Sequence, residues 1–127
     1  MQKIRILITD DHTLVRQGIR VMMASQQDIE VVGEASNGQM AIELTRQLMP
    51  DVILMDVSMP VMSGIEATRV IHAENPEVKV IGLSMFEASE QADIMRQAGA
   101  VNYLCKRGPL DIMLKAIRDS VTPGSCA

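Results

Sequence analysis

The sequence has very few aromatic residues: no Trp, one Tyr and one Phe in 127 residues. We therefore expect no platform on which nucleic-acid bases stack. Basic residues are also in the minority, since 12 Lys and Arg stand against 16 Asp and Glu and give a formal net charge of −4 at pH 7. A domain with this acidic balance is not expected to contact nucleic acid directly through its phosphates.

Long apolar runs and cysteines are scarce as well. The apolar runs cover only a few residues each, so we expect no membrane-spanning helix and no contact with a membrane. No apolar stretch of the length found in signal peptides precedes the first acidic pair, and no signal peptide is visible. The two cysteines, Cys105 and Cys126, form no Cys-x-x-Cys pair. We interpret them as reduced thiols, which favours a cytoplasmic location.

The composition that remains is that of a globular domain. Hydrophobic residues make up 47% of the chain and charged residues 22%, close to the averages for folded proteins. A chain of this length can bury a core without disulfide or metal cross-links. We expect one domain over residues 1–121, followed by a tail or the start of a linker over residues 122–127.

Five short β-rich runs alternate with helical patterns along the chain. The runs are Ile4–Thr9, Ile29–Ala35, Val52–Met55, Val78–Ser84 and Val101–Cys105. The second run alternates polar and apolar residues, as an edge strand does, and the third is continuously apolar, as a strand covered on both faces is. Five consecutive βα units predict an α/β fold, a doubly wound five-stranded parallel sheet with helices on both faces.

Capping and turn residues mark several helix boundaries. Candidate N-caps precede three of the helical patterns, at Asn37, Ser63 and Ser89. Gly99 is expected to adopt the left-handed conformation after the fourth helix. Pro109 opens the last helix, where a proline in the first turn is tolerated.

Polar residues stand at the carboxyl ends of four of the five predicted strands. Asp10 and Asp11 follow the first strand, Asp56 follows the third, Ser84 ends the fourth and Lys106 follows the fifth. The carboxyl ends of parallel strands meet at one edge of the sheet, so these groups should converge. Two like charges about 4 Å apart repel by roughly 4 kcal/mol at an effective dielectric constant near 20. Three carboxylates must therefore take up protons or hold a cation.

Carboxylate oxygens favour a hard divalent cation, which we predict to be Mg²⁺. His12 stands beside the acidic pair, and we interpret it as a surface or capping residue. A single Asp at a strand end is as readily explained as a cap or a turn residue. The prediction of a site therefore depends on the whole set.

These residues, in this order, resemble the receiver domain of bacterial two-component response regulators. The resemblance rests on the acidic pair Asp10 and Asp11, the segment DVSMP at 56–60 followed by Gly64, Ser84, and the segment YLCK at 103–106. It extends from Ile4 to about Ser120. The segments TDDHTLVRQGI and EVVGEASNGQMAIEL further resemble the subfamily whose receivers often precede a helix-turn-helix output domain. The family fold is the flavodoxin-like (βα)5 sheet of strand order 2-1-3-4-5.

The resemblance implies a phosphoacceptor and a set of metal ligands. Asp56 would accept the phosphoryl group from a histidine kinase or a histidine phosphotransfer domain. Asp11 and Asp56 would bind Mg²⁺ directly and Asp10 through water, and the backbone carbonyl of Ser58 would complete the protein ligands. Lys106 would pair with a phosphoryl oxygen.

The resemblance also implies a switch and a set of partners. Ser84 would donate its hydroxyl to the phosphoryl group, and Tyr103 would turn inward when Ser84 moves. The surface formed by the fourth helix, the fifth strand and the fifth helix would then change, and a homodimer through this surface is a further expectation. An output or kinase domain, covalently linked but outside this sequence, would receive the signal.

One departure from the family pattern and one alternative function accompany this interpretation. Met85 stands where receivers usually carry a small residue and is followed by Phe86; we predict that both lie at the rim of the site and slow the loss of the phosphoryl group, unless Phe86 only packs on the fourth helix. Gly64 is expected to supply a positive φ. The alternative function is a Mg²⁺-dependent phosphatase with an Asp nucleophile. Its motif requires a second Asp where Ser58 stands.

Overall fold

A computed structural model of the chain describes residues 3–59, 61–85 and 90–121. Its strands are β1 (Ile4–Thr9), β2 (Ile29–Ala35), β3 (Val52–Asp56), β4 (Lys79–Ser84) and β5 (Asn102–Cys105). Its helices are α1 (Thr13–Ala24), α2 (Gly38–Leu48), α3 (Gly64–Glu74), α4 (Glu90–Ala98) and α5 (Leu110–Val121). The bounds of all five predicted strands agree with the structure within one residue.

The strands form one parallel sheet in the order β2-β1-β3-β4-β5. This order confirms the predicted doubly wound fold. The alternating run forms β2 at an edge of the sheet, and the continuously apolar run forms β3 at its centre, with all five residues buried. The order places β1 beside β3, so the chain segments that follow these two strands emerge side by side.

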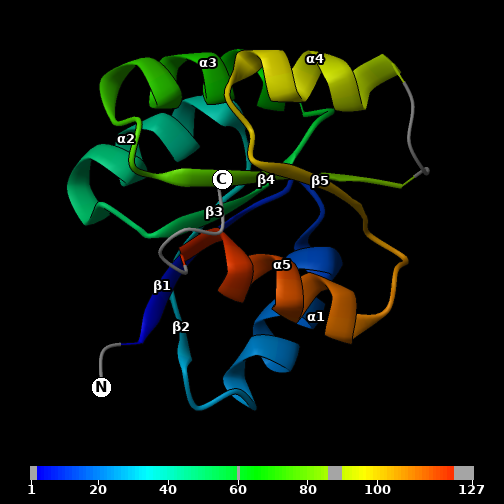
Figure 1. Cartoon of the computed structure of the whole chain (residues 1–127). Helices are drawn as coiled ribbons and strands as arrows, with labels where there is room; N and C mark the ends of the chain where they lie inside the picture. Colours follow the sequence, from blue (N-terminus) through cyan, green and yellow to red (C-terminus); the bar gives the residue numbers. More distant parts are fainter. Residues whose placement is uncertain (1–2, 60, 86–89, 122–127) are drawn as a thin grey trace.

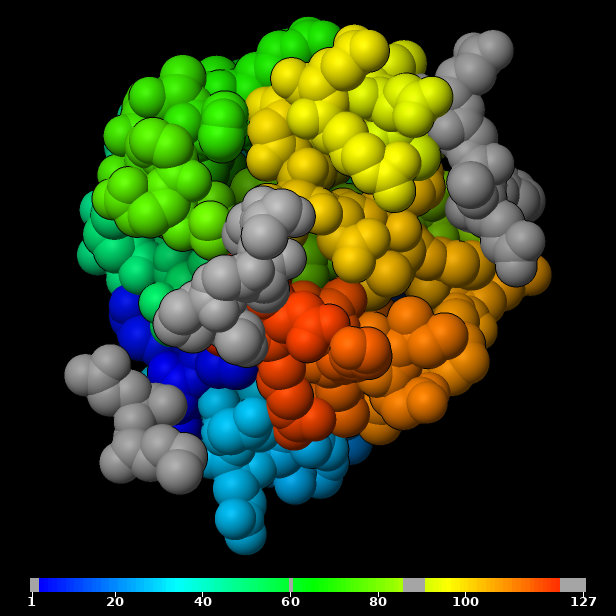
Figure 2. Space-filling view, in the orientation of Figure 1, coloured from blue at the N-terminus to red at the C-terminus, as the bar shows by residue number. Residues whose placement is uncertain are grey.

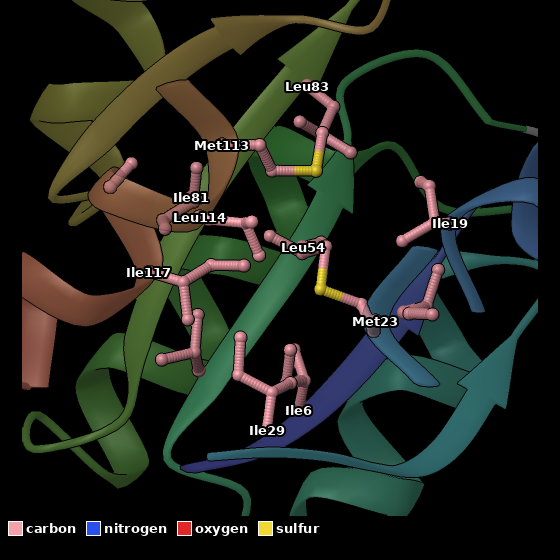
Figure 3. Packing of buried hydrophobic residues seen from close by; sticks show 13 residues of the cluster. Ile6, Ile19, Met23, Ile29, Leu54, Ile81, Leu83, Met113, Leu114 and Ile117 are labelled. Atoms are coloured by element: carbon pink, nitrogen blue, oxygen red, sulfur yellow. The ribbon is translucent and has the colours of Figure 1, made fainter. Parts of the chain in front are cut away.

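Helices cover both faces of the sheet. Figure 1 shows α2, α3 and α4 on one side and α1 and α5 on the other. Side chains point alternately to the two faces along a strand, so Ile6 and Ile8 pack toward α1 and α5 while Leu7 packs on the opposite face. In Figure 3, Met23 of α1 and Ile117 of α5 lie with Leu54 of β3 in the first of these two cores.

The predicted caps lie where the sequence indicated. The side chain of Asn37 accepts a hydrogen bond from the amide of Met40 at 2.9 Å, and that of Ser63 accepts one from the amide of Glu66 at 3.2 Å. Gly99 has a φ of 122° and confirms the predicted positive φ at the end of α4. The predicted cap Ser89 lies outside the described residues.

The prediction for Gly64 was wrong, because this residue does not have a positive φ. A Cβ atom at Gly64 would instead lie 2.0 Å from the carbonyl oxygen of Asp56. The glycine is therefore needed for close approach of α3 to the end of β3, and a side chain there would displace Asp56.

Two further features of the described chain complete the fold. Figure 2 shows α4 in yellow and α5 in orange to red on one face of the molecule, with β5 between them. Among the residues that the structure describes, no helix combines the length and the hydropathy that a membrane span requires.

Candidate functional site

The carboxyl end of the sheet brings three acidic side chains and one lysine together. Thr9 of β1 pairs with Met55 of β3, so Asp10 and Asp56 follow on adjacent strands. The Nζ atom of Lys106, just after β5, lies 2.5 Å from Oδ2 of Asp10 and 3.2 Å from Oδ2 of Asp56. The side chains of Asp10, Asp56 and Lys106 are 0%, 5% and 6% exposed. The predicted convergence therefore occurs in a buried pocket.

The pKa values of the two buried carboxyl groups that share Lys106 shift in opposite directions. Burial raises the pKa of Asp10, but bonds from Lys106 and from the His12 amide outweigh this effect, and the net pKa lies below its ordinary value. Burial and the negative charge of Asp10 raise the pKa of Asp56 to about 6. Burial lowers the pKa of Lys106, yet the two carboxylates raise it overall, so the lysine stays charged.

The pocket has the donor set for a divalent cation. Ligand atoms of Asp10, Asp11, His12 and Asp56 all lie within 4.8 Å of one another. Three buried carboxylate oxygens lie within ion-pair distance of Lys106 or His12 but lack a hydrogen bond of standard geometry among the described residues: Oδ2 of Asp10, Oδ1 of Asp11 and Oδ2 of Asp56. Lys106 lies within ion-pair distance of the two Oδ2 atoms, but one ammonium group cannot offset three carboxylates. These unsatisfied oxygens fit a hard cation such as Mg²⁺.

The loop after β3 holds Asp56 through backbone contacts. The amide of Val57 donates to the carbonyl of Leu83 on β4 at 3.1 Å, and the amide of Gly64 donates to the carbonyl of Val57 at 2.9 Å. The amide of Ser58 donates to Oδ1 of Asp56 at 3.3 Å. Oδ1 is thus oriented by its own loop, while Oδ2 faces Lys106.

Ser84 and Tyr103 lie on the two neighbouring strands. Ser84 is 8% exposed, and its carbonyl accepts a hydrogen bond from the amide of Lys106 at 2.7 Å. Tyr103 pairs with Gly82, and its ring packs against that glycine, since a Cβ atom there would lie only 2.8 Å from Cδ1 of Tyr103. The Tyr103 hydroxyl is buried and has no hydrogen-bond partner within residues 3–59, 61–85 and 90–121.

Met85 follows β4 directly and is 39% exposed. Its carbonyl oxygen lies 3.6 Å from Sγ of Cys105, the residue before Lys106. Met85 is therefore next to the pocket along the chain and exposed to solvent. Phe86, the other residue predicted for the rim, lies outside the described residues.

Arg16 is a contact of the pocket that the sequence analysis did not identify. Its guanidinium donates to the carbonyl oxygen of Asp10 at 2.6 Å and contacts the carboxylate of Glu34 on β2 at 3.3 Å. Its side chain is only 15% exposed, so Arg16 fixes the segment that carries the acidic pair. No spacing rule distinguishes this arginine from Arg20, the other basic residue of α1, since Glu34 lies 18 residues further along the chain.

His12 occupies the predicted capping position but does not act as a side-chain cap. It is the residue before α1, and its side chain makes no cap hydrogen bond. The ring turns back to the acidic pair, with Nδ1 3.0 Å from Oδ1 of Asp10 and 3.1 Å from Oδ1 of Asp11. The side chain remains 64% exposed, as expected for a surface residue.

Comparisons with known proteins agree with this architecture. Residues 6–118 match the family described as response regulator receiver domain. The response regulator GacA of Pseudomonas aeruginosa is 43% identical over 115 residues, which cover 91% of this chain and 54% of GacA. The transcriptional regulatory protein LiaR of Bacillus subtilis is 44% identical over 115 residues, with the same coverage of 91% and 54%. The chain thus spans about half the length of these relatives.

Solved structures give the same result. The response regulator domain of Thermotoga maritima CheB has a TM-score of 0.87 and 33% identity, covering 96% of this chain and 100% of the other. The receiver domain of the response regulator NarL from Mycobacterium tuberculosis has a TM-score of 0.85 and 28% identity, covering 93% and 98%. The family match covers most of the chain, and the strand order agrees with the predicted fold. The chain therefore belongs to the family of response regulator receiver domains of two-component systems.

Proposed function

We propose that Asp56 accepts a phosphoryl group from a phosphohistidine on a histidine kinase or a histidine phosphotransfer domain. The observation that carries this proposal is the carboxylate cluster of Asp10, Asp11 and Asp56, in which the buried Asp10 and Asp56 share the ammonium group of Lys106. The pKa of Asp56 is raised to about 6, so its carboxylate is still mostly ionised at neutral pH. It is therefore available as a nucleophile.

The transfer exchanges one bond to phosphorus for another. A carboxylate oxygen of Asp56 attacks the phosphorus atom, the bond between phosphorus and the donor imidazole nitrogen breaks, and its electron pair stays on that nitrogen. The product is an aspartyl phosphate. Lys106 moves its ion pair from the carboxylate to a phosphoryl oxygen, and Ser84 donates its hydroxyl to another. Such a transfer depends mainly on positioning and charge neutralisation.

We propose that Asp11 and Asp56 bind Mg²⁺ directly, that Asp10 binds it through water and that the Ser58 carbonyl completes the protein ligands. The carboxylate oxygens without hydrogen bonds support this assignment. When bound, Mg²⁺ supplies positive charge that offsets the carboxylates and the phosphoryl oxygens. Lys106 alone brings one positive charge, and Arg16 keeps the backbone of Asp10 in place through its carbonyl.

Phosphorylation would act on the rest of the molecule through Ser84 and Tyr103. The buried hydroxyl of Tyr103 has no hydrogen-bond partner among the described residues, so no hydrogen bond from these residues fixes the position of its ring. We propose that movement of Ser84 toward the phosphoryl group lets Tyr103 turn inward and changes the surface of α4, β5 and α5 seen in Figure 2. A homodimer through this surface is part of the same proposal.

The relatives support a proposal for the domain limits and the partners. The chain spans about half the length of the relatives it matches, some of which are named transcriptional regulators. We propose a receiver domain over residues 1–121, with residues 122–127 as a tail or the start of a linker to an output or kinase domain. A helix-turn-helix output would contact DNA, whereas the acidic receiver would not. We propose a cytoplasmic location, where a regulator of transcription acts.

We propose that the domain assists its own phosphorylation and dephosphorylation but does not turn over a free substrate. The alternative, a Mg²⁺-dependent phosphatase, is not favoured by the family match. Its motif also needs a second Asp where Ser58 stands. A receiver is phosphorylated once per chain, whereas a phosphatase would hydrolyse many molecules of a phosphate ester.

The test is incubation with acetyl phosphate and Mg²⁺, followed by intact-protein mass spectrometry. We expect one added phosphoryl group on the wild-type chain and none on Asp56→Asn. Asp93→Asn is the matched control, because the Asp93 side chain is 80% exposed on α4; it should be phosphorylated like the wild type. Phosphorylation of Asp56→Asn to the wild-type extent would contradict the proposal.

The contribution of Met85 is tested by the lifetime of the phosphoryl group. We expect Met85→Ala to lose it faster, because water reaches the acyl phosphate more easily when the side chain at the rim is small. The decay of the phosphorylated mass after removal of acetyl phosphate measures this. An unchanged rate of phosphoryl loss would show that Met85 does not slow this loss, and it would leave the role of Asp56 unaffected.

A further inference from the structure

The imidazole of His12 is oriented toward the proposed metal site. Nδ1 lies 3.0 Å from Oδ1 of Asp10 and 3.1 Å from Oδ1 of Asp11. Lys106 contacts the other oxygen, Oδ2, of Asp10. The imidazole therefore contacts Oδ1 of the buried Asp10 carboxylate and the ammonium group contacts Oδ2. The lysine does not take the place of the imidazole at Oδ1.

These separations agree with the geometry of an octahedral metal site. Two ligands at right angles on an ion with bonds of about 2.1 Å are about 3.0 Å apart. The distance of 3.1 Å from Nδ1 of His12 to Oδ1 of Asp11, the proposed direct ligand, is close to that value. All four side chains of the cluster, including Asp56, have a ligand atom within 4.8 Å of the others. One ion can therefore be shared by one nitrogen and several carboxylate oxygens.

We propose that His12 is a nitrogen ligand for divalent transition-metal ions at this site, with Co²⁺ as the probe. Imidazole is a good ligand for Co²⁺, Ni²⁺ and Zn²⁺, whereas Mg²⁺ selects oxygen. The inference rests on the metal site of the proposed function and adds one ligand to it.

The backbone allows this role. His12 stands before the first turn of α1, where a side chain often caps the helix, yet its ring makes no cap hydrogen bond. The backbone of His12 is held independently, since its amide donates to Oδ1 of Asp10 at 2.9 Å and its carbonyl accepts from the amide of Arg16 at 3.1 Å. A change of side chain at residue 12 should therefore leave the fold intact.

The experiment is a calorimetric titration of the full chain with Co²⁺ and, separately, with Mg²⁺. The matched pair of variants is His12→Gln and His72→Gln, because His72 on α3 is the other histidine of the sequence. Glutamine keeps a hydrogen-bonding side chain but is a poor ligand for Co²⁺. We expect His12→Gln to weaken Co²⁺ binding by at least about tenfold, the loss that even outer partners of a metal site cause. Mg²⁺ binding by this variant should change little, and His72→Gln should change neither affinity.

A second readout identifies the ligand directly. Co²⁺ is paramagnetic, so a coordinated imidazole gives strongly shifted ring-proton signals in the proton NMR spectrum of the complex. We expect these signals in the wild type and in His72→Gln and expect them to be absent from His12→Gln. If Co²⁺ and Mg²⁺ both bind but His12→Gln changes neither the Co²⁺ affinity nor the spectrum, His12 is only a hydrogen-bonding residue and the inference is wrong. If neither ion binds the wild type, the metal site of the proposed function fails as well.

Discussion

The carboxylates at the two ends of the parallel sheet differ in their hydrogen-bond and ion-pair partners. At the amino end, Asp51 accepts a hydrogen bond from the amide of Arg5 at 2.9 Å, and the two carboxylate oxygens of Asp28 accept bonds from Arg118 at 2.8 Å each. Each of these acids has its own donor. At the carboxyl end, Asp10 and Asp56 share Lys106, and these two acids and Asp11 each retain a buried oxygen without a hydrogen bond of standard geometry among the described residues.

The pKa values of Asp28 at the amino end and Asp56 at the carboxyl end shift in opposite directions. The bond from Arg118 lowers the pKa of Asp28, whereas burial and the charge of Asp10 raise that of Asp56 to about 6. A strand end thus does not by itself leave a carboxylate unsatisfied. The carboxyl end has a local surplus of buried negative charge, which suits a cation and a reacting phosphoryl group.

The largest expected effect is the loss of the shared lysine. Lys106→Met leaves the buried carboxylates of Asp10 and Asp56 without a counter-charge, and we expect a loss of roughly 3 kcal/mol in the free energy of unfolding at neutral pH. Urea denaturation measures this. Lys115→Met is the control, because that lysine pairs with Asp119 on the exposed side of α5, and its loss should be small. Equal effects in both variants would remove the distinction between the pocket and the surface.

Asp56→Asn should stabilise the protein at neutral pH. The folded-state pKa of Asp56, about 6, lies above the ordinary value of 3.8, so the folded state binds this proton more tightly than the unfolded state. Stability contributed by this group is therefore present at low pH and is lost as the pH rises from 3.8 to about 6. Asparagine avoids that loss, worth roughly 1–3 kcal/mol. Urea denaturation across this pH range should show a gap between variant and wild type that closes toward acid pH; a gap independent of pH would contradict the account.

At the amino end, Arg118→Met should have the smallest effect and the opposite dependence on pH. The pKa of Asp28 is lowered by Arg118, so the stability from this pair is present above the ordinary pKa and is lost as the pH falls. Both side chains are more than a third exposed, so salt screens the pair. Thermal unfolding should show a small loss at neutral pH that shrinks at low pH and at high salt. A larger loss than that of Lys106→Met would reverse the comparison.

Much of the fold follows from local patterns in the sequence. The alternating and continuous apolar runs indicated the positions of β2 and β3, and Asn37 and Ser63 marked two helix starts. The convergence of the acids with Lys106 was predictable too, because the carboxyl ends of parallel strands must meet at one edge.

What the sequence could not indicate depends on contacts between distant segments. The contact of Arg16 with Glu34 and the close approach of Gly64 to the Asp56 carbonyl arise only when α1, α3 and the sheet are packed together. The same is true of the His12 ring, whose orientation is set by the Asp10 and Asp11 side chains rather than by its position before a helix. Spacing predicts which elements meet, but it does not predict the rotamer of each side chain there.

The proposed function requires that the Asp56 carboxylate carries the phosphoryl group. Borohydride reduction of the phosphorylated chain shows which carboxylate carries it. Borohydride converts an aspartyl phosphate into homoserine, which peptide mass spectrometry locates at a defined residue. We expect homoserine at position 56 after treatment with acetyl phosphate and Mg²⁺, and none at positions 10, 11, 28 or 51. Homoserine at one of those positions with Asp56 unmodified would contradict the account.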